Sequence, residues 1–141
     1  MNRWLLIVVI ALLLSACKLL DQLDDAVITV AGRVTDDGQP VAGVIVLLVK
    51  SSDAVEGLSL ANGSITDSRG EYLILDVKSG SYYLMAVEDR NGNLQYDRQI
   101  DRLGFYGVNP AGQDFEPDLF RVHAKDMTSI NVTDLYSLAA D

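Results

Sequence analysis

Residues 64–97 read SITDSRGEYLILDVKSGSYYLMAVEDRNGNLQYD, and this stretch decides the fold of the chain. It has turn residues at Asp67–Gly70 and again at Lys78–Gly80, with apolar residues at alternate positions between the two turns. The next segment, Tyr82–Val87, is apolar on both faces, as a central strand is. Because both turns are short, we expect three neighbouring antiparallel strands here, followed by an acidic loop.

Two further strands are expected before this stretch. Val27–Thr35 has apolar residues on one face, and Asp36–Gln39 has the composition of a hairpin turn. Val44–Val49 reads VIVLLV, a short run of apolar residues rich in β-branched side chains. Such a run predicts a strand that is buried on both faces in the centre of a sheet.

The pattern after the acidic loop is weaker. Ile100–Pro117 shows no periodicity and is interrupted by glycine and proline, so we expect a long loop. Two last strands are expected at Leu119–His123 and Thr128–Tyr136. About seven strands with turns between them and no convincing helix favour an all-β fold, a single antiparallel β-sandwich over residues 27–138.

Three short motifs resemble the carboxypeptidase regulatory-like domain. They are GRVTDDGQPVAGV at Gly32–Val44, TDSRGEY at Thr66–Tyr72 and SGSY at Ser79–Tyr82. The resemblance covers about Val27–Glu88 and implies a transthyretin-like (prealbumin-like), Greek-key β-sandwich of the kind common in secreted bacterial proteins. The motifs are turn and core positions, so they imply a fold and carry no activity with them.

The first residues of the chain indicate export. A short positive region is followed by the apolar run Trp4–Leu14, which is shorter than the roughly 20 residues that span a bilayer. Leu14-Ser15-Ala16-Cys17 then resembles the bacterial lipobox, which implies cleavage before Cys17 and a diacylglyceryl thioether on its sulfur. Cys17 is the single cysteine of the chain. The alternative is an ordinary secretory signal with an incidental cysteine.

The expected organisation therefore has three parts. Residues 1–16 are a lipoprotein signal peptide, 17–26 are the lipidated N-terminus and a tether, and 27–138 are the β-sandwich domain. Several acyl chains such as palmitate on one residue form a stable membrane anchor. Lys18 follows the cysteine, where an aspartate resembles an inner-membrane retention signal in Gram-negative lipoproteins. For a Gram-negative source we therefore expect attachment to the outer membrane, facing the periplasm or the cell surface.

The composition limits the partners. The 141 residues include 11 Lys and Arg against 20 Asp and Glu, for a net charge of −9. Such an acidic chain argues against nucleic acid as a partner and against electrostatic adhesion to anionic lipid.

No catalytic constellation is evident. His123 is the single histidine, it lies in an expected strand, and no G-x-S-x-G nucleophile motif accompanies it. One histidine and a lipidated cysteine are too few ligands for a zinc site. We therefore predict a non-catalytic envelope lipoprotein, not an enzyme, that binds or supports a partner such as an envelope protein or a glycan. The alternatives are a carbohydrate- or peptide-binding module that serves a neighbouring enzyme, and a small hydrolase.

The acidic loop has oxygen-bearing side chains at the spacing of a calcium loop. The predicted ligands of a weak Ca²⁺ site are Asp89, Asn91, Asn93, the Gln95 carbonyl, Asp97 and Asp101. Leu94 and Ile100 stand where an EF-hand loop has its glycine and its bidentate glutamate. The alternative is an Asn- and Gly-rich loop that is held by hydrogen bonds from side chain to backbone.

A glycan-binding surface would need exposed aromatic side chains. Aromatic rings on the surface can stack on sugars, whereas buried rings belong to the core. The residues that decide between these alternatives are Tyr72, Tyr82, Tyr83, Phe105, Tyr106 and Phe115.

Overall fold

The computed structural model describes residues 27–52 and 62–138. The predicted signal peptide, lipidation site and tether lie outside the described residues. The strands are β1 (Val30–Arg33), β2 (Thr35–Asp36), β3 (Gln39–Pro40), β4 (Ile45–Val49), β5 (Gly63–Ile65), β6 (Glu71–Ile74), β7 (Gly80–Glu88), β8 (Arg102–Phe105) and β9 (Phe120–Val122). One 3₁₀ turn, η2, covers Pro110–Gly112. Within the described residues no helix is long and apolar enough to cross a membrane.

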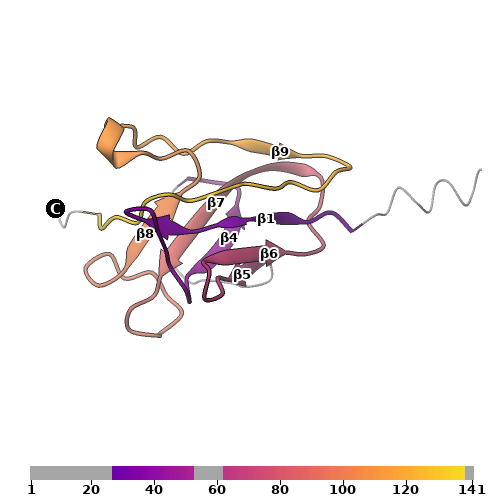
Figure 1. Ribbon diagram of the computed structural model, residues 1–141. Helices are drawn as coiled ribbons and strands as arrows, with labels where there is room; N and C mark the ends of the chain where they lie inside the picture. Colours follow the sequence, from indigo (N-terminus) through magenta and orange to yellow (C-terminus); the bar gives the residue numbers. More distant parts are fainter. Residues whose placement is uncertain (1–26, 53–61, 139–141) are drawn as a thin grey trace, which may run out of the picture.

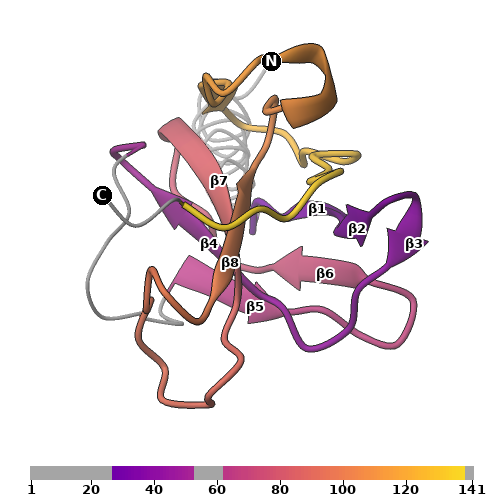
Figure 2. The same ribbon diagram turned by 90° about the vertical axis from the view of Figure 1, so that its left-hand side faces the viewer.

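The described strands lie in two layers (Figures 1 and 2). The larger sheet has the order β5-β4-β7-β8, and β9 pairs with the first residues of β7. The other layer contains β1 paired with β6, and β2 and β3 form a separate two-residue hairpin. All these strand pairs are antiparallel, so the domain is all-β with antiparallel sheets, as the sequence predicts.

The expectation that the three strands of the opening stretch are neighbours is wrong. β5 pairs with β4, β6 with β1, and β7 with β4 and β8, so β6 lies in the opposite layer from the other two. The turn at Asp67–Gly70 moves the chain from the larger sheet to the other layer. The Asp67 carboxylate accepts the N–H of Glu71 at 2.9 Å, and Gly70 has a φ of +71°. The N–H of Val34 then donates to the Gly70 carbonyl at 2.8 Å, which places the new strand beside β1. The short turn therefore connects two layers instead of closing a hairpin.

The predicted loop over 100–117 contains β8, which the sequence did not reveal. Leu103, Gly104 and Phe105 are all buried, so no alternation of apolar and polar residues marks the strand. Gly104 has no room for a side chain, because a Cβ there would lie 2.3 Å from the Asp134 carbonyl oxygen. Residues 127–136, which we call the C-terminal segment, cross this strand closely and cover it.

The last predicted strand, 128–136, joins the two layers without forming a regular ladder. Met127 and Val132 bridge in parallel to Val30 and Val34, whereas Tyr136 bridges antiparallel to Leu103 of β8. A φ of +62° at Ser129 interrupts the segment between these bridges. The segment therefore extends the smaller layer and then reaches the larger sheet.

Two hydrophobic clusters lie on opposite faces of the larger sheet. The inner cluster lies between the layers and includes Val46 and Leu84 from the larger sheet and Val30 and Ile74 from the other layer. The outer cluster covers the far face. The prediction that the strand at 44–49 is buried on both faces in a sheet centre is confirmed. The outer cluster contains Ile45, Leu47, Met85, Val87, Leu103, Phe105 and Val108.

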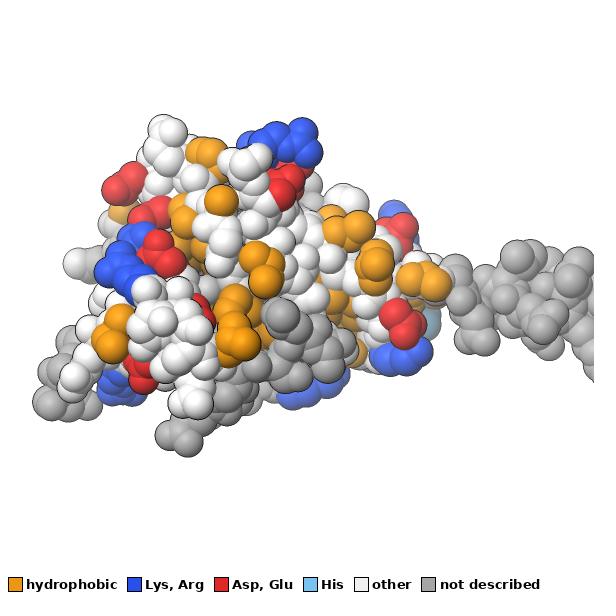
Figure 3. Space-filling view, turned by 90° about the horizontal axis from the view of Figure 1, so that it is seen from below, with side chains coloured by type: hydrophobic (Ala, Val, Ile, Leu, Met, Phe, Trp, Pro, Cys, Tyr) orange, Lys and Arg blue, Asp and Glu red, His pale blue; other side chains and the backbone are white. Residues whose placement is uncertain are grey.

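Some large hydrophobic side chains stay on the surface. Figure 3 shows hydrophobic side chains among polar and charged ones on one face of the molecule. Scattered apolar residues of this kind are normal on the surface of a folded domain. They are Val27, Ile65, Leu73, Leu75, Leu94, Ile100, Phe115 and Leu119.

Candidate functional site

The acidic loop connects β7 to β8 and is fixed at both ends by the sheet. Glu88, the last residue of β7, pairs across the ladder with Arg102, the first residue of β8. The ring of Tyr96 packs against the outer hydrophobic cluster and holds the middle of the loop close to the domain. Burial raises the pKa of its hydroxyl, and this buried oxygen has no hydrogen-bond partner among the described residues.

Asp89 shapes the first turn of the loop. Its Oδ1 accepts the N–H of Gly92 at 2.8 Å, and its Oδ2 accepts the N–H of Leu94 at 2.8 Å. Positive φ angles at Gly92 (+69°) and Leu94 (+58°) turn these N–H groups towards the carboxylate. The carboxylate is therefore engaged by the backbone, as the alternative interpretation of this loop expects.

Three predicted ligands meet at one oxygen atom. The side-chain Nδ2 atoms of Asn91 and Asn93 both donate to Oδ2 of Asp97, at 2.7 Å each. The Asn93 Oδ1 atom accepts the N–H of Gln95 at 2.9 Å, so it faces the backbone. The structure thus brings Asn91, Asn93 and Asp97 together, with amide nitrogens and not oxygens directed at the shared point.

Asp101 lies beneath the loop and is completely buried. Its Oδ1 accepts the N–H of Arg90 at 2.9 Å, and its Oδ2 accepts the N–H of Asp97 at 2.8 Å. One buried carboxylate thereby joins the two sides of the loop, and both of its oxygens are used. It has a structural position, apart from the point where Asn91, Asn93 and Asp97 meet.

In this arrangement the carboxylates of the loop accept hydrogen bonds from side chains and backbone N–H groups of the same loop, and no ion is needed to complete these contacts. Among the described residues, no group of three or more His, Cys, Asp or Glu side chains is placed to hold a metal. An asparagine amide exchanges its oxygen and nitrogen by a half-turn about its last torsion. A cation at Asp97 Oδ2 would therefore require both Asn91 and Asn93 to turn their amides.

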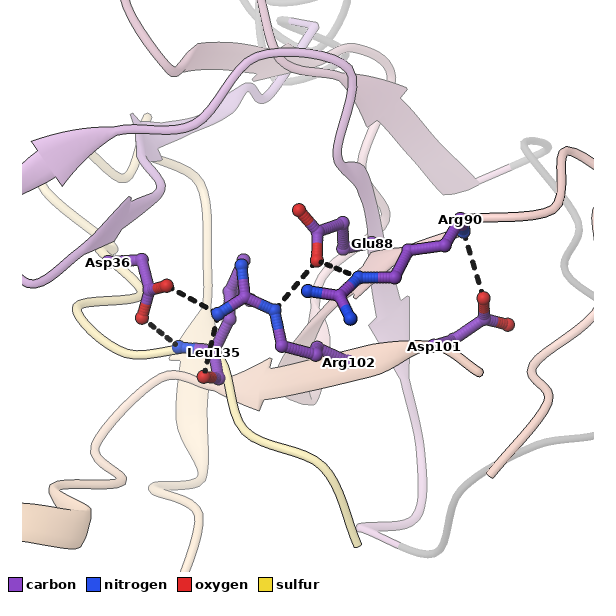
Figure 4. A network of polar contacts seen from close by, with 6 residues as sticks. All are labelled: Asp36, Glu88, Arg90, Asp101, Arg102 and Leu135. Carbon is purple, nitrogen blue, oxygen red and sulfur yellow. Dashed lines mark hydrogen bonds and ion pairs between the residues drawn. The ribbon is translucent and has the colours of Figure 1, made fainter. Parts of the chain in front are cut away.

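A network centred on Arg102 ties this loop to the rest of the domain (Figure 4). Its Nε donates to Glu88 at 2.7 Å, and its Nη1 donates to the Asp36 carboxylate in the β2–β3 hairpin. Asp36 also accepts the N–H of Leu135 at 3.2 Å, and Arg90 donates to the same Glu88 oxygen at 2.9 Å. One guanidinium group thus connects the hairpin, the base of the loop and the C-terminal segment.

This network shifts the ionisation of its members. The hydrogen bond from Arg102 lowers the pKa of Glu88 below its usual value, and Arg90 adds to this effect. The same bond to Glu88 raises the pKa of Arg102. Sequence analysis missed Arg102, because it lies in a segment without periodicity and its two partners are distant along the chain.

Replacing Arg102 with methionine is expected to destabilise the domain by about 2 kcal/mol, because the mostly covered Asp36 carboxylate loses its ion-pair partner and Glu88 keeps Arg90 alone. The side chains of Glu88 and Asp36 are 25% and 23% exposed. Urea unfolding at neutral pH measures the change. Arg33→Met is the matched control, since its ion pair with Glu71 is exposed and worth less than about 1 kcal/mol. Equal losses in the two variants would contradict the role given to Arg102.

The pH dependence of this effect has a definite sign. The pKa of Glu88 is lower in the folded chain than its ordinary value of 4.5. Its contribution to stability is therefore complete above 4.5 and is lost as the pH falls through the folded pKa. We expect the stability difference between the parent and Arg102→Met to shrink below that pH, as followed by urea unfolding. A difference that stays constant into strong acid would show that Glu88 does not depend on Arg102.

The remaining candidate residues are dispersed. His123 is exposed just after β9. Tyr72, Tyr82 and Phe105 are buried, and Tyr83 and Tyr106 are half-buried, so Phe115 is the one exposed ring of the six considered for glycan binding.

One groove of the described surface is lined by residues that make structural contacts. It has a volume of about 400 Å³ and runs between β1 and the C-terminal segment. Within it, Arg33 binds Glu71 at 2.8 Å, and the Tyr72 hydroxyl donates to the Ile130 carbonyl. Its charged and phenolic groups therefore hold the smaller layer together.

Known proteins give no guide to the role of these residues. Comparisons of the chain with family models, with curated proteins and with solved structures found no match.

Proposed function

We propose that this protein is a lipid-anchored, non-catalytic β-domain of the bacterial cell envelope that binds or supports a partner. The observation that carries the proposal is the placement of the single cysteine, Cys17, after a short apolar run and Leu14-Ser15-Ala16. A lipid on Cys17 would hold the domain on the outer membrane, on its periplasmic side or at the cell surface.

We also propose a transthyretin-like β-sandwich of the carboxypeptidase regulatory-like type for residues 27–138. Two layers that share the inner hydrophobic cluster support this class. Seven strands of three or more residues also support it, with β2 and β3 forming a small additional hairpin. The motifs at 32–44 and 66–72 support it further, since the second contains the turn that moves the chain between layers.

The burial of the aromatic residues favours a protein partner over a glycan. A sugar-binding platform uses ring faces that are open to solvent. Phe115 alone is exposed among the six candidate rings, and it forms a T-shaped contact with the ring of Tyr136. An envelope protein therefore ranks before a carbohydrate as the partner in this proposal.

Cys17→Ser tests the anchor. The variant is expected to lose all incorporation of labelled palmitate and to accumulate as the precursor, because serine offers no thiol for the thioether. Ser15→Ala is the matched control and should be labelled as the parent is, since it keeps a small residue before the cysteine. Equal palmitate labelling of Cys17→Ser and the parent would refute the anchor.

Weak calcium binding by the 89–101 loop is a second candidate. The convergence of Asn91 and Asn93 on Asp97 Oδ2 favours it, because after rotation the two amides would offer oxygens next to a carboxylate. A ligand set with more neutral amide oxygens than carboxylates binds Ca²⁺ weakly, which suits the millimolar calcium found outside cells. When bound, the ion would supply charge neutralisation and rigidity to the loop.

Thermal melts in millimolar CaCl₂ and in EDTA test this candidate. The melting temperature of the parent is expected to rise by several degrees in calcium, because ligand that binds the folded state alone stabilises it. Asp97→Ala should abolish the rise, whereas Asp114→Ala, an acid outside this loop, should keep it. A parent that melts at the same temperature in both buffers would make the loop a turn held by its own hydrogen bonds.

A further inference from the structure

The C-terminal segment forms one edge of the smaller layer. It lies beside β1, between that strand and the loop that contains η2 (Figures 1 and 2). Met127 and Val132 bridge to β1, and on the other side of residues 128–133 no strand of the described chain is paired. The smaller layer therefore ends at this segment.

Two residues of the segment turn their backbone groups away from β1. The N–H of Val132 donates to the Arg33 carbonyl at 3.0 Å, and its carbonyl accepts the N–H of Thr35 at 2.8 Å. Because successive residues of an extended chain direct their N–H and C=O groups to opposite sides, those of Asn131 and Thr133 point outward. No hydrogen bond from the described residues engages these four groups. Two donors and two acceptors are thus open at the edge of the layer.

A groove runs along this open edge. The C-terminal segment from Ser129 to Asp134 lines one side of the groove, and Tyr106–Asn109 line the other. Its volume is about 440 Å³, which lies within the roughly 300–1,000 Å³ of ligand-binding clefts. In the groove beside β1 the polar groups hold the smaller layer together, whereas here the backbone groups at the edge are unused. Another chain can therefore reach them without displacing part of the domain.

The open edge lacks most of the features that prevent strand pairing. Proteins protect exposed edges with lysine, proline, inward-pointing charges or a covering segment. Residues 128–133 read TSINVT and contain neither proline nor a charged residue. The left-handed φ of +62° at Ser129 limits the regular part of the edge to the residues that follow it. A short, uncharged edge of this kind is suited to one added strand of limited length.

The groove is acidic and has no basic side chain among its lining residues. Asp134 lines it directly, and Asp118 lies against its far wall, since a Cβ at Gly107 would be 2.5 Å from Oδ2 of Asp118. Arg33, which lines the neighbouring groove, is paired with Glu71. These carboxylates favour a basic occupant. They disfavour a second copy of this chain, because each copy carries a net charge of −9.

We propose that the open edge at Asn131 and Thr133 binds an extended, basic peptide segment of a partner protein, which adds one strand to the smaller layer. In this mode of recognition the main chain supplies hydrogen bonds that any extended peptide can make, and side chains around the edge select the sequence. Asp118 and Asp134 would select lysine or arginine. The inference rests on the proposed function, because that function gives the domain a protein partner, but it does not require the lipid on Cys17.

Amide hydrogen exchange of the lipidated protein in detergent micelles, followed by NMR, tests the edge. The probe is the acetylated and amidated peptide KVTVTVK, whose β-branched residues favour an extended chain and whose lysines match the two acids. Without the peptide, the N–H groups of Asn131 and Thr133 should exchange faster than that of Val132. Millimolar peptide should slow exchange at 131 and 133 tenfold or more. Unchanged exchange at both positions would overturn the proposal.

Thr133→Pro and Thr133→Val form a matched pair. Proline removes the N–H at 133, which has no partner in the free domain, whereas valine keeps it. The proline variant should bind the peptide about tenfold more weakly, and the valine variant should bind it as the parent does. Thermal melts verify that both variants are folded. Equal affinities of two folded variants would overturn the added strand.

A charge exchange tests the same site without proline. The peptide EVTVTVE should bind the parent at least tenfold more weakly than KVTVTVK, because its glutamates meet the two acids. Asp118→Asn with Asp134→Asn should remove most of this preference. A preference that is equally large in the double variant would overturn the placement of the peptide in this groove.

Two further readings of the same samples separate the remaining outcomes. Protein that is dimeric without peptide and already protected at 131 and 133 would replace the peptide with a second copy and overturn the proposal. Palmitate on Cys17 without protection by peptide keeps the anchor and overturns the peptide site. Protection by peptide in protein without palmitate supports the peptide site and refutes the anchor. The absence of both refutes both.

Discussion

Replacing Val46 with aspartate is expected to unfold the domain. Val46 lies in the middle of β4, between β5 and β7, and its side chain is completely buried in the inner cluster. A carboxylate at this position would have no partner and no water. The cost is several kcal/mol, against a total stability of about 5–15 kcal/mol for a domain of this kind. Circular dichroism of the purified variant should show no cooperative thermal transition.

Leu73→Asp is the control for this experiment. Leu73 also lies in a strand, but its side chain is 50% exposed on the outer face of β6. It should keep a cooperative transition within about 1 kcal/mol of the parent. A Val46→Asp variant that melts as the parent does would mean that β4 is not in the centre of the sheet.

Replacing Gly32 with alanine is expected to cost about 3 kcal/mol, although only one methyl group is added. A Cβ at this position would lie 2.0 Å from the Ile130 carbonyl oxygen and 2.9 Å from the Tyr72 hydroxyl. The methyl group would therefore push the C-terminal segment off β1 and disturb the hydrogen bond between Tyr72 and Ile130. Urea unfolding of the variant and the parent gives the difference in free energy.

Gly38→Ala separates this clash from the general cost of losing a glycine. Gly38 has a φ of +75° in the β2–β3 turn, but a Cβ there would meet no atom within 4 Å. Its replacement should cost about 1 kcal/mol, for the left-handed backbone alone. If Gly32→Ala cost no more than Gly38→Ala, the C-terminal segment would not lie on β1 as closely as the structure places it.

The strongest strands could be predicted from the sequence because burial on both faces produces an unmistakable pattern. The VIVLLV run became β4, and the apolar segment 82–87 became the centre of β7. The assignment of strands to layers could not be predicted. Whether the turn at 67–70 closes a hairpin or changes layers depends on Val34, a residue distant in sequence, whose N–H binds the Gly70 carbonyl.

The elements with weaker sequence patterns were predicted wrongly for a related reason. β8 owes its burial to the C-terminal segment that crosses Gly104, so its own residues show no strand pattern. In the candidate site, spacing predicted that Asp89, Asn91 and Asn93 come to one point, with Asp97 beside them. The structure brings Asn91 and Asn93 to Asp97, whereas the Asp89 carboxylate is bound by backbone N–H groups. The position of Asp101 beneath the loop depends on the N–H groups of Arg90 and Asp97, which no spacing rule describes.

The intact mass of the mature protein, purified from membranes in detergent, tests the central proposal most directly. A lipid-anchored envelope protein is expected to begin at Cys17 and to carry the added mass of a diacylglyceryl group, with or without an N-terminal acyl chain. A tandem spectrum should locate the added mass on Cys17. A mature protein with an unmodified Cys17, or one that begins at another residue, would contradict the proposal.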